Sequence, residues 1–285
     1  SVYANLGLNT ANMGDLHQAV VYLKKGMYLL DKVEQHSNNV KFIFNLGFAQ
    51  VYFGLKNFKR AEELIEKSLK LKNVYFGIDN YAIVHNHLGY CCIELKKYDK
   101  AISEFTKTYD LAIDIDNKVL QSYAVNNIGE VYLAKEEYEN AKVQFEKALV
   151  LKQSIYDTMS VEHTNLYLGK TLYFLNDYNK AKSLLTQAYN FFNRTNDNYR
   201  ITIILETLYK VCEKTGDFDD AYKYVKEYLR LKEQEEDQET ELLLKKMDFT
   251  KDSIASAQIK QEEERAHSEE LAKRVKTKNI ALVSG

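Results

Sequence analysis

The chain has 285 residues, of which 45% are hydrophobic and 28% are charged, so its composition is that of a folded protein and excludes a disordered one. The formal net charge of -2 excludes the basic footprint of a nucleic-acid-binding protein, and three cysteines without a framework spacing argue against a disulfide-built fold. Proline is absent and glycine occurs only 11 times, so residues that interrupt helices are scarce and an all-α fold is expected.

A repeating pattern runs along residues 1–231. Its most regular feature is an alanine that follows an aromatic residue or Leu by three positions. The six alanines are Ala19, Ala61, Ala101, Ala141, Ala181 and Ala221. Their spacing is 42 residues once and 40 residues thereafter, and an apolar residue follows each alanine four positions later. A fixed period of this length is typical of stacked helical hairpins, and the pattern predicts six of them.

Small residues also mark the first helix of most predicted hairpins. A glycine lies twelve positions before the repeat alanine at Gly7, Gly89, Gly129 and Gly169. Ala49 occupies this slot in the second unit, where the nearby Gly47 is not assigned to it, and Tyr209 occupies it in the sixth. Small residues on both helices let the two backbones approach at their crossing, and apolar spacings of three and four give each helix a buried stripe. Because one hairpin cannot bury that stripe alone, neighbouring hairpins are expected to stack.

These features resemble the tetratricopeptide repeat over residues 1–231, with a pitch longer than the usual unit and without its frequent proline. The longer pitch is similar to that of kinesin light chains and bacterial peptide-sensing regulators. The resemblance implies a right-handed superhelical solenoid of six hairpins whose first helices line a concave groove. It also implies a module that binds a protein or peptide rather than an enzyme.

Residues at fixed offsets from the glycine slot are expected to line the groove. They are Asn86, Tyr90, Ile93, Asn126, Glu130, Leu133, Lys170 and Tyr173. Asn86 and Asn126 occupy equivalent positions, and an asparagine side chain can bond a peptide backbone as both donor and acceptor. The alternative is that these two asparagines cap turns or face water. No unit carries a lysine at this offset, which disfavours the family's carboxylate clamp for chaperone tails.

Other polar groups do not form a recognisable catalytic or metal centre. His87 and Cys91 share a helical face but His85 does not, and two ligands do not make a zinc site, so buried cysteines are expected instead. Phosphate-binding loops, nucleophile turns and paired carboxylates are not recognisable either. The sequence therefore predicts no cofactor, no metal and no enzymatic activity in this chain.

The segment 232–279 changes character. Residues spaced alternately by four and three positions run from Leu243 to Val275, which predicts a coiled-coil-like helix that forms a parallel homodimer over 240–278. The alternative is a single charged helix that separates two domains. Residues 280–285 are expected to begin a membrane span or the next domain, so the chain is expected to be part of a longer protein tethered to a membrane beyond Gly285.

The resemblance and the tail together favour the input region of a signal-transduction protein, such as a sensor histidine kinase of a two-component system. A peptide-responsive regulator of the bacterial pheromone-receptor type and a passive assembly scaffold are alternatives. The array is expected at the cytoplasmic or the periplasmic face of a bacterial membrane, and the sequence does not distinguish between these two faces.

Overall fold

The computed structural model describes residues 2–30, 37–71 and 77–235, and all structural statements concern these residues. The chain divides into two compact units, Ser1–Gln234 and Glu235–Gly285. The predicted tail helix over 240–278 and the apolar residues 280–285 lie outside the described residues.

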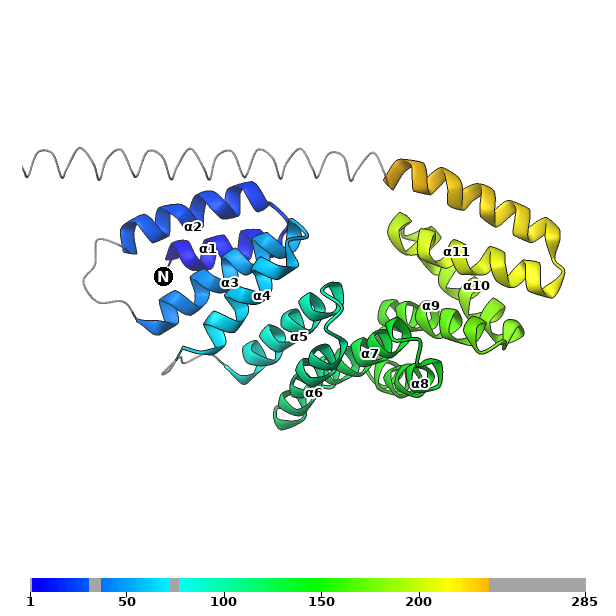
Figure 1. The fold of residues 1–285 in the computed structure, drawn as a ribbon, viewed down its shortest axis with the longest axis horizontal. Coiled ribbons are helices and arrows are strands. Elements are labelled where there is room, and N and C mark those ends of the chain that lie inside the picture. Colours follow the sequence, from blue (N-terminus) through cyan, green and yellow to red (C-terminus); the bar gives the residue numbers. More distant parts are fainter. Residues whose placement is uncertain (1, 31–36, 72–76, 236–285) are drawn as a thin grey trace, which may run out of the picture. The chain divides into compact units, whose positions relative to one another are not determined.

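The described residues form helices paired into hairpins, without strands, which confirms the all-α prediction (Figure 1). The first three hairpins are α1 (Val2–Asn12) with α2 (Leu16–Leu30), α3 (Asn38–Gly54) with α4 (Phe58–Leu69), and α5 (Ile78–Glu94) with α6 (Tyr98–Asp114). The next three are α7 (Lys118–Ala134) with α8 (Tyr138–Ser154), α9 (Thr158–Phe174) with α10 (Tyr178–Arg194), and α11 (Asn198–Thr215) with a helix over 218–235. The six hairpins fall where the repeat alanines predict them.

The helices from α5 to α10 are of equal length, 17 residues each, and each is followed by a linker of three residues. The middle residue of each linker adopts a left-handed conformation with φ between 50° and 62°, although none is glycine. The residue after it donates its N–H back into the preceding helix, as Lys97 does to the Cys92 carbonyl at 2.8 Å. This closure resembles the Schellman pattern of helix ends. In several linkers the same residue then caps the next helix, as Asp157 does through the N–H of Ser160.

Small residues hold the helices together where the sequence predicts close crossings. Ala101, Ala141 and Ala181 are all 0% exposed. A Cβ atom on Gly89 would lie 2.5 Å from Cε1 of Phe105 on α6, so only glycine lets these two helices approach so closely. Gly47, which lies outside the expected glycine slot, makes a similar close approach to Leu23 of the preceding hairpin.

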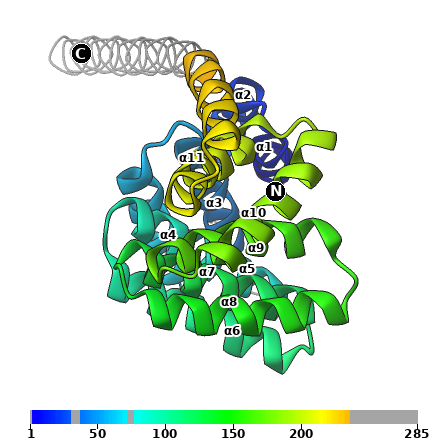
Figure 2. The ribbon, with the colours of Figure 1, turned by 90° about the vertical axis from the view of Figure 1, so that its right-hand side faces the viewer.

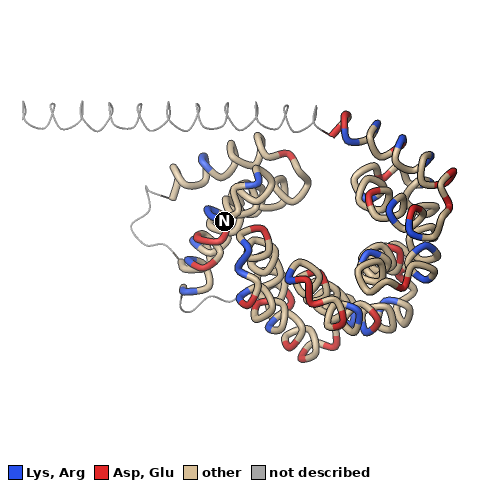
Figure 3. The backbone as a smooth tube through the Cα atoms, turned by 45° about the vertical axis from the view of Figure 1, so that its right-hand side comes forward, with Lys and Arg blue, Asp and Glu red and all other residues tan. Residues whose placement is uncertain are grey.

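The hairpins pack in chain order, so each first helix lies near the first helices of its neighbours. Figures 1 and 2 show α5, α7 and α9 side by side, with α6 and α8 on the other side of the stack. The side formed by α1, α3, α5, α7, α9 and α11 is called the first-helix face. Acidic and basic residues are interspersed along the described helices (Figure 3), as the near-neutral net charge predicts. No described helix is long and apolar enough to cross a membrane.

Candidate functional site

A chain of polar side chains connects α5 and α7 on the first-helix face. The Tyr90 hydroxyl donates to Asn127 Oδ1 at 2.9 Å, and Asn127 Nδ2 donates to Asn86 Oδ1 at 2.8 Å. All three residues come from first helices of adjacent repeats. Asn86 and Tyr90 of α5 are therefore linked by the side chain of Asn127 on α7, which is 2% exposed.

Asn126 lies in the interior and does not pair with Asn86. It is 2% exposed, its Nδ2 donates to Glu130 at 2.7 Å, and its Oδ1 accepts from Lys152 at 3.0 Å and Thr164 at 2.7 Å. The expected ladder of Asn86 and Asn126 is thus replaced by a contact between Asn86 and the next residue along α7. The physical reason is Lys152, which is 1% exposed and needs buried oxygen acceptors at this position.

Burial shifts the titration of the groups around Asn126. Burial raises the pKa of Glu130 to about 7, although the charge of Lys152 and the hydrogen bond from Asn126 both oppose the shift. Burial also lowers the pKa of Lys152 to about 8. The Glu130 carboxylate, followed by burial, raises the pKa of Tyr167, so these two groups influence each other on neighbouring first helices. Glu130 consequently changes its charge near neutral pH.

The other residues expected to line the groove are partly covered by neighbouring side chains. Ile93, Leu133 and Tyr173 are partly buried and pack against the two hydrophobic cores. The Tyr173 ring lies 5.3 Å from that of Phe174 and 5.9 Å from that of Tyr178. Lys170 is partly buried and makes no hydrogen bond or ion pair within the described residues. Of this group, Lys170 is the side chain most free to meet a ligand.

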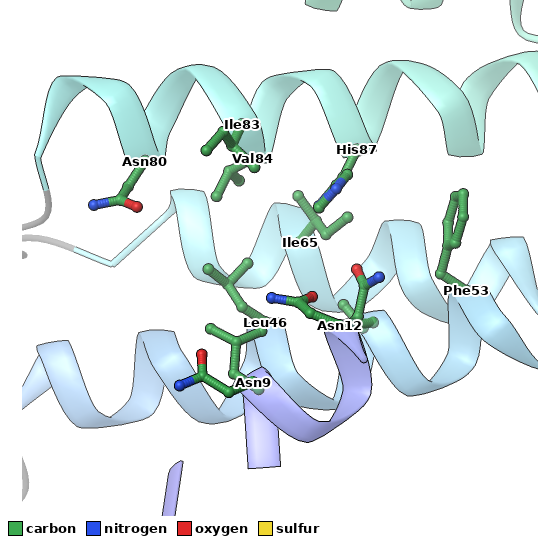
Figure 4. A pocket seen from close by; sticks show the side chains of 12 residues that line it. Asn9, Asn12, Leu46, Phe53, Ile65, Asn80, Ile83, Val84 and His87 are labelled. Atoms are coloured by element: carbon green, nitrogen blue, oxygen red, sulfur yellow. The ribbon is translucent and has the colours of Figure 1, made fainter. Parts of the chain in front are cut away.

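A pocket of about 200 Å³ lies between α1, α3 and α5. Its floor is apolar and includes Leu46, Ile65 and Val84, which are all buried. Four amide side chains line it as well, namely Asn9, Asn12, Gln50 and Asn80. Figure 4 shows Asn9 and Asn12 of α1 across from Asn80 of α5, with Leu46 and Ile65 between the helices.

His87 completes the polar lining of this pocket. Burial lowers the pKa of His87, so its ring is neutral at physiological pH. The ring lies 6.3 Å from the Phe53 ring, which also lines the pocket. Neither His87 nor any of the four amides makes a side-chain hydrogen bond to another described residue, so all five offer unused bonding capacity.

The sequence did not reveal this pocket because its amides occupy different offsets in three repeats. A repeat pattern identifies residues at the same offset, whereas Asn9, Gln50 and Asn80 converge only through the packing of α1 on α3 and of α5 on the second hairpin. Asn127 could have been suspected, since it shares its offset with His87. The three cysteines are free and 0% exposed, as expected, and no group of metal-ligating side chains exists among the described residues.

Comparison with known proteins identifies the repeat. Residues 42–114 and 122–154 match two family profiles, each described as tetratricopeptide repeat. The outer dynein arm-docking complex subunit 4 of Danio rerio is 24% identical over 162 residues, which are 57% of this chain and 32% of that protein. The chain thus spans about a third of the length of this curated relative.

Solved structures share the fold. A Rap protein complexed with Competence and Sporulation Factor has a TM-score of 0.63 at 13% identity, covering 83% of this chain and 77% of that one. BtubC (BKLC) from P. vanneervenii has a TM-score of 0.57 at 18% identity, covering 68% and 80%. A Rap conjugation gene regulator of plasmid pLS20, in complex with the Phr* peptide, has a TM-score of 0.59 at 14% identity, covering 82% and 75%.

Modules of this repeat bind proteins or peptides, and two of the solved structures are complexes with a factor or a peptide. The register of the alanines, the six hairpins and the family profiles agree. The chain therefore contains tetratricopeptide repeats.

Proposed function

We propose that the array binds an extended peptide along its first-helix face and is the input region of a signal-transduction protein. The observation that carries this proposal is the polar chain of Tyr90, Asn127 and Asn86, which crosses from one repeat to the next. Asn127 is 2% exposed and positions the partly buried Asn86, whose amide can bond backbone groups of a ligand whatever the ligand's side chains are. Glu130, Lys170 and the edges of Ile93, Leu133 and Tyr173 would flank such a ligand.

Solved structures of the same fold support a peptide as the ligand of the array. Of two Rap structures of the same fold, one is a complex with Competence and Sporulation Factor and the other a complex with the Phr* peptide. A peptide-responsive regulator is therefore the nearest alternative within the same ligand class. The two readings share the binding face and differ only in what the bound array controls.

The last described helix supports the connection to an output. Phe218, Tyr222 and Leu229 are 70%, 69% and 61% exposed on the helix over 218–235. Tyr222 and Leu229 are one heptad apart, and Leu229 lies two heptads before Leu243, where the predicted seam begins. A parallel homodimer through 240–278 would therefore extend onto the array itself. Binding in the array would then bias the dimer, which only requires different affinities of the peptide for two states.

A cross-linking experiment tests this connection. The native cysteines are buried, and burial raises the pKa of the Cys91 thiol to about 12, so Leu271→Cys provides the reactive thiol. The proposal expects a covalent dimer under mild oxidation and a yield that changes when a bound peptide is added. Peptide binding without any cross-link at position 271 would contradict the signalling role and leave peptide binding intact.

An assembly scaffold is a second candidate function. It is supported by the likeness over 57% of the chain to a subunit named for docking of the outer dynein arm. A scaffold would bind a folded protein over several hairpins, and its affinity would survive loss of the Asn86 and Asn127 amides. Affinity of such a partner for Asn86→Ala with Asn127→Ala separates the two functions.

A further inference from the structure

The pocket between α1, α3 and α5 differs from the polar chain of α5 and α7 in its chemistry. Twelve residues line it, and none of them is Asp, Glu, Lys or Arg. Its only titratable group is His87, which burial keeps neutral at physiological pH. A charged group that entered would lose its hydration without gaining an opposite charge.

The size of the pocket limits what can enter. Its volume is about 200 Å³, below the roughly 300–1,000 Å³ of sites that enclose a drug-sized ligand. The buried part of the lining is aliphatic, with Leu46, Ile65 and Val84 at the floor. This space suits one aliphatic side chain rather than a whole small molecule or a large aromatic ring.

The aliphatic floor accepts a side chain, and the amides around it can bond the peptide backbone on either side of that side chain. Asn9 and Asn12 come from α1, Gln50 from α3 and Asn80 from α5. Each carries a carbonyl acceptor and an NH₂ donor, and none uses them on another described side chain. A peptide backbone in extended conformation presents alternating donors and acceptors that such amides can pair. Figure 4 shows Asn9 and Asn12 on α1 and Asn80 on α5, on opposite sides of the apolar residues Leu46 and Ile65.

We infer that this pocket is a specificity site for an uncharged, extended peptide segment that inserts one aliphatic side chain between α1, α3 and α5. The inference rests on the proposed peptide-binding function and adds the class of residue that the peptide must carry. The aliphatic side chain contacts Leu46, Ile65 and Val84, while Asn9, Asn12, Gln50 and Asn80 bond the flanking backbone. Charged residues next to the anchor are excluded because nothing in the lining compensates them.

Selection from a library of random linear heptapeptides, displayed on phage and bound to the immobilised chain, tests the inference. The selected peptides should share one Leu, Ile or Val with uncharged neighbours. The tightest one is then synthesised and titrated against wild type and Gln50→Glu, which changes the pocket by one charge at nearly constant shape. Its affinity should fall about tenfold, and selection on Gln50→Glu should instead enrich Lys or Arg beside the anchor. Gln153→Glu, on the exposed surface of α8, is the matched control and should leave the affinity unchanged.

The outcomes separate this inference from the proposed function. Peptides rich in Asp, Glu, Lys or Arg around the anchor would overturn the inference. Peptides that tolerate Gln50→Glu but are lost with Asn86→Ala and Asn127→Ala would also overturn it, while the proposed function would stand. If wild type selects no peptide, both fail. Equal melting curves of the variants ensure that a loss of affinity is not a loss of folding.

Discussion

Lys97 Nζ donates to both oxygens of the Glu62 carboxylate, at 2.6 and 2.8 Å, and thereby joins the second hairpin to the third. The same spacing along the chain joins Lys182 to Asp217, at 2.8 Å, with the charges exchanged. The second partners follow the same rule, because Lys100 bonds Glu62 and Asp220 bonds Lys182. If the third hairpin packed in place of the sixth, its lysines would meet Lys182, and two like charges would repel. The opposite arrangement of charges at the two junctions therefore favours the native order of the repeats.

Loss of the Glu62 carboxylate should destabilise the array at neutral pH and leave its stability in acid almost unchanged. Burial alone would raise the pKa of Glu62, but the hydrogen bonds from Lys100 and Lys97 outweigh it and hold the pKa below 4.5. A carboxyl with a lowered folded pKa contributes stability above its unfolded pKa and loses it as pH falls through the folded value. Glu62→Gln should therefore cost about 1–2 kcal/mol at pH 7 and almost nothing below the folded pKa.

Thermal melts at several pH values measure this difference. Glu63→Gln serves as the control, because Glu63 is exposed and pairs only with Arg60 on the same helix. Its midpoint should stay close to that of wild type. A cost for Glu62→Gln that is the same at all pH values would contradict the assigned role of the lysines.

Glu130 should show the opposite dependence on pH. Its folded pKa of about 7 lies above its ordinary value of 4.5, so the folded chain binds the extra proton between these two values. Ionised Glu130 consequently destabilises the fold above pH 7, and this cost is absent below pH 4.5. Glu130→Gln should stabilise the array by about 1 kcal/mol at pH 8 and leave it unchanged at pH 4. Urea unfolding at the two pH values, with the exposed Glu146→Gln as control, provides the test, and an equal effect at both would refute the assignment.

Overpacking a helix crossing should destabilise the repeat. Ala141 is 0% exposed where α7 and α8 cross, and the larger side chain of Ala141→Leu should cost about 1–3 kcal/mol. Glu146→Leu places the same side chain on the exposed surface of α8 and should change the free energy of unfolding by less than about 0.5 kcal/mol. Equal melting midpoints for the two variants would show that the register of the repeat is wrong.

Substitutions at two neighbouring residues of the linker 155–157 should change the free energy of unfolding in opposite directions. Tyr156 has a φ of 55° and is 93% exposed, so Tyr156→Gly relieves left-handed strain without losing a contact. A net gain of about 0.5–1 kcal/mol is expected, since glycine also costs backbone entropy. Asp157→Ala removes the cap of α9 and should cost about 1 kcal/mol. Chemical denaturation measures both, and a loss of stability in Tyr156→Gly would argue against strain at this position.

Much of the fold could be predicted from the sequence because close helix crossings demand small residues. The alanines at 40-residue spacing located all six hairpins, and the three tested alanines are fully buried. The linkers could not be predicted in the same way, since Lys96, Glu136 and Tyr156 adopt left-handed conformations that their residue types do not favour. These conformations accompany the backbone hydrogen bonds that close each linker onto the preceding helix, such as Lys97 to Cys92.

The site was predicted only in part. The offset from the glycine slot selected Asn86 and Tyr90, which do belong to the polar chain, but it selected Asn126 in place of Asn127, because adjacent helical residues point about 100° apart and an offset does not say which of the two bonds the next repeat. Asn126 and Asn127 are both 2% exposed, and the buried amine of Lys152, which comes from another helix, engages Asn126 and leaves Asn127 to bond Asn86. The predicted tail seam over 240–278 lies outside the described residues and stays a prediction.

The central claim, that the first-helix face binds an extended peptide through amides of successive repeats, is tested most directly by one titration. A heptapeptide selected on the wild-type chain is titrated calorimetrically against Asn86→Ala with Asn127→Ala, and against Asn140→Ala with Asn179→Ala, two exposed residues near the starts of α8 and α10. Loss of the Asn86 and Asn127 amides should weaken binding at least tenfold, because each unmade bond costs about 1 kcal/mol. The variant with Asn140→Ala and Asn179→Ala should bind within about twofold of wild type. Equal affinities of the two double variants, both folded by circular dichroism, would contradict the account.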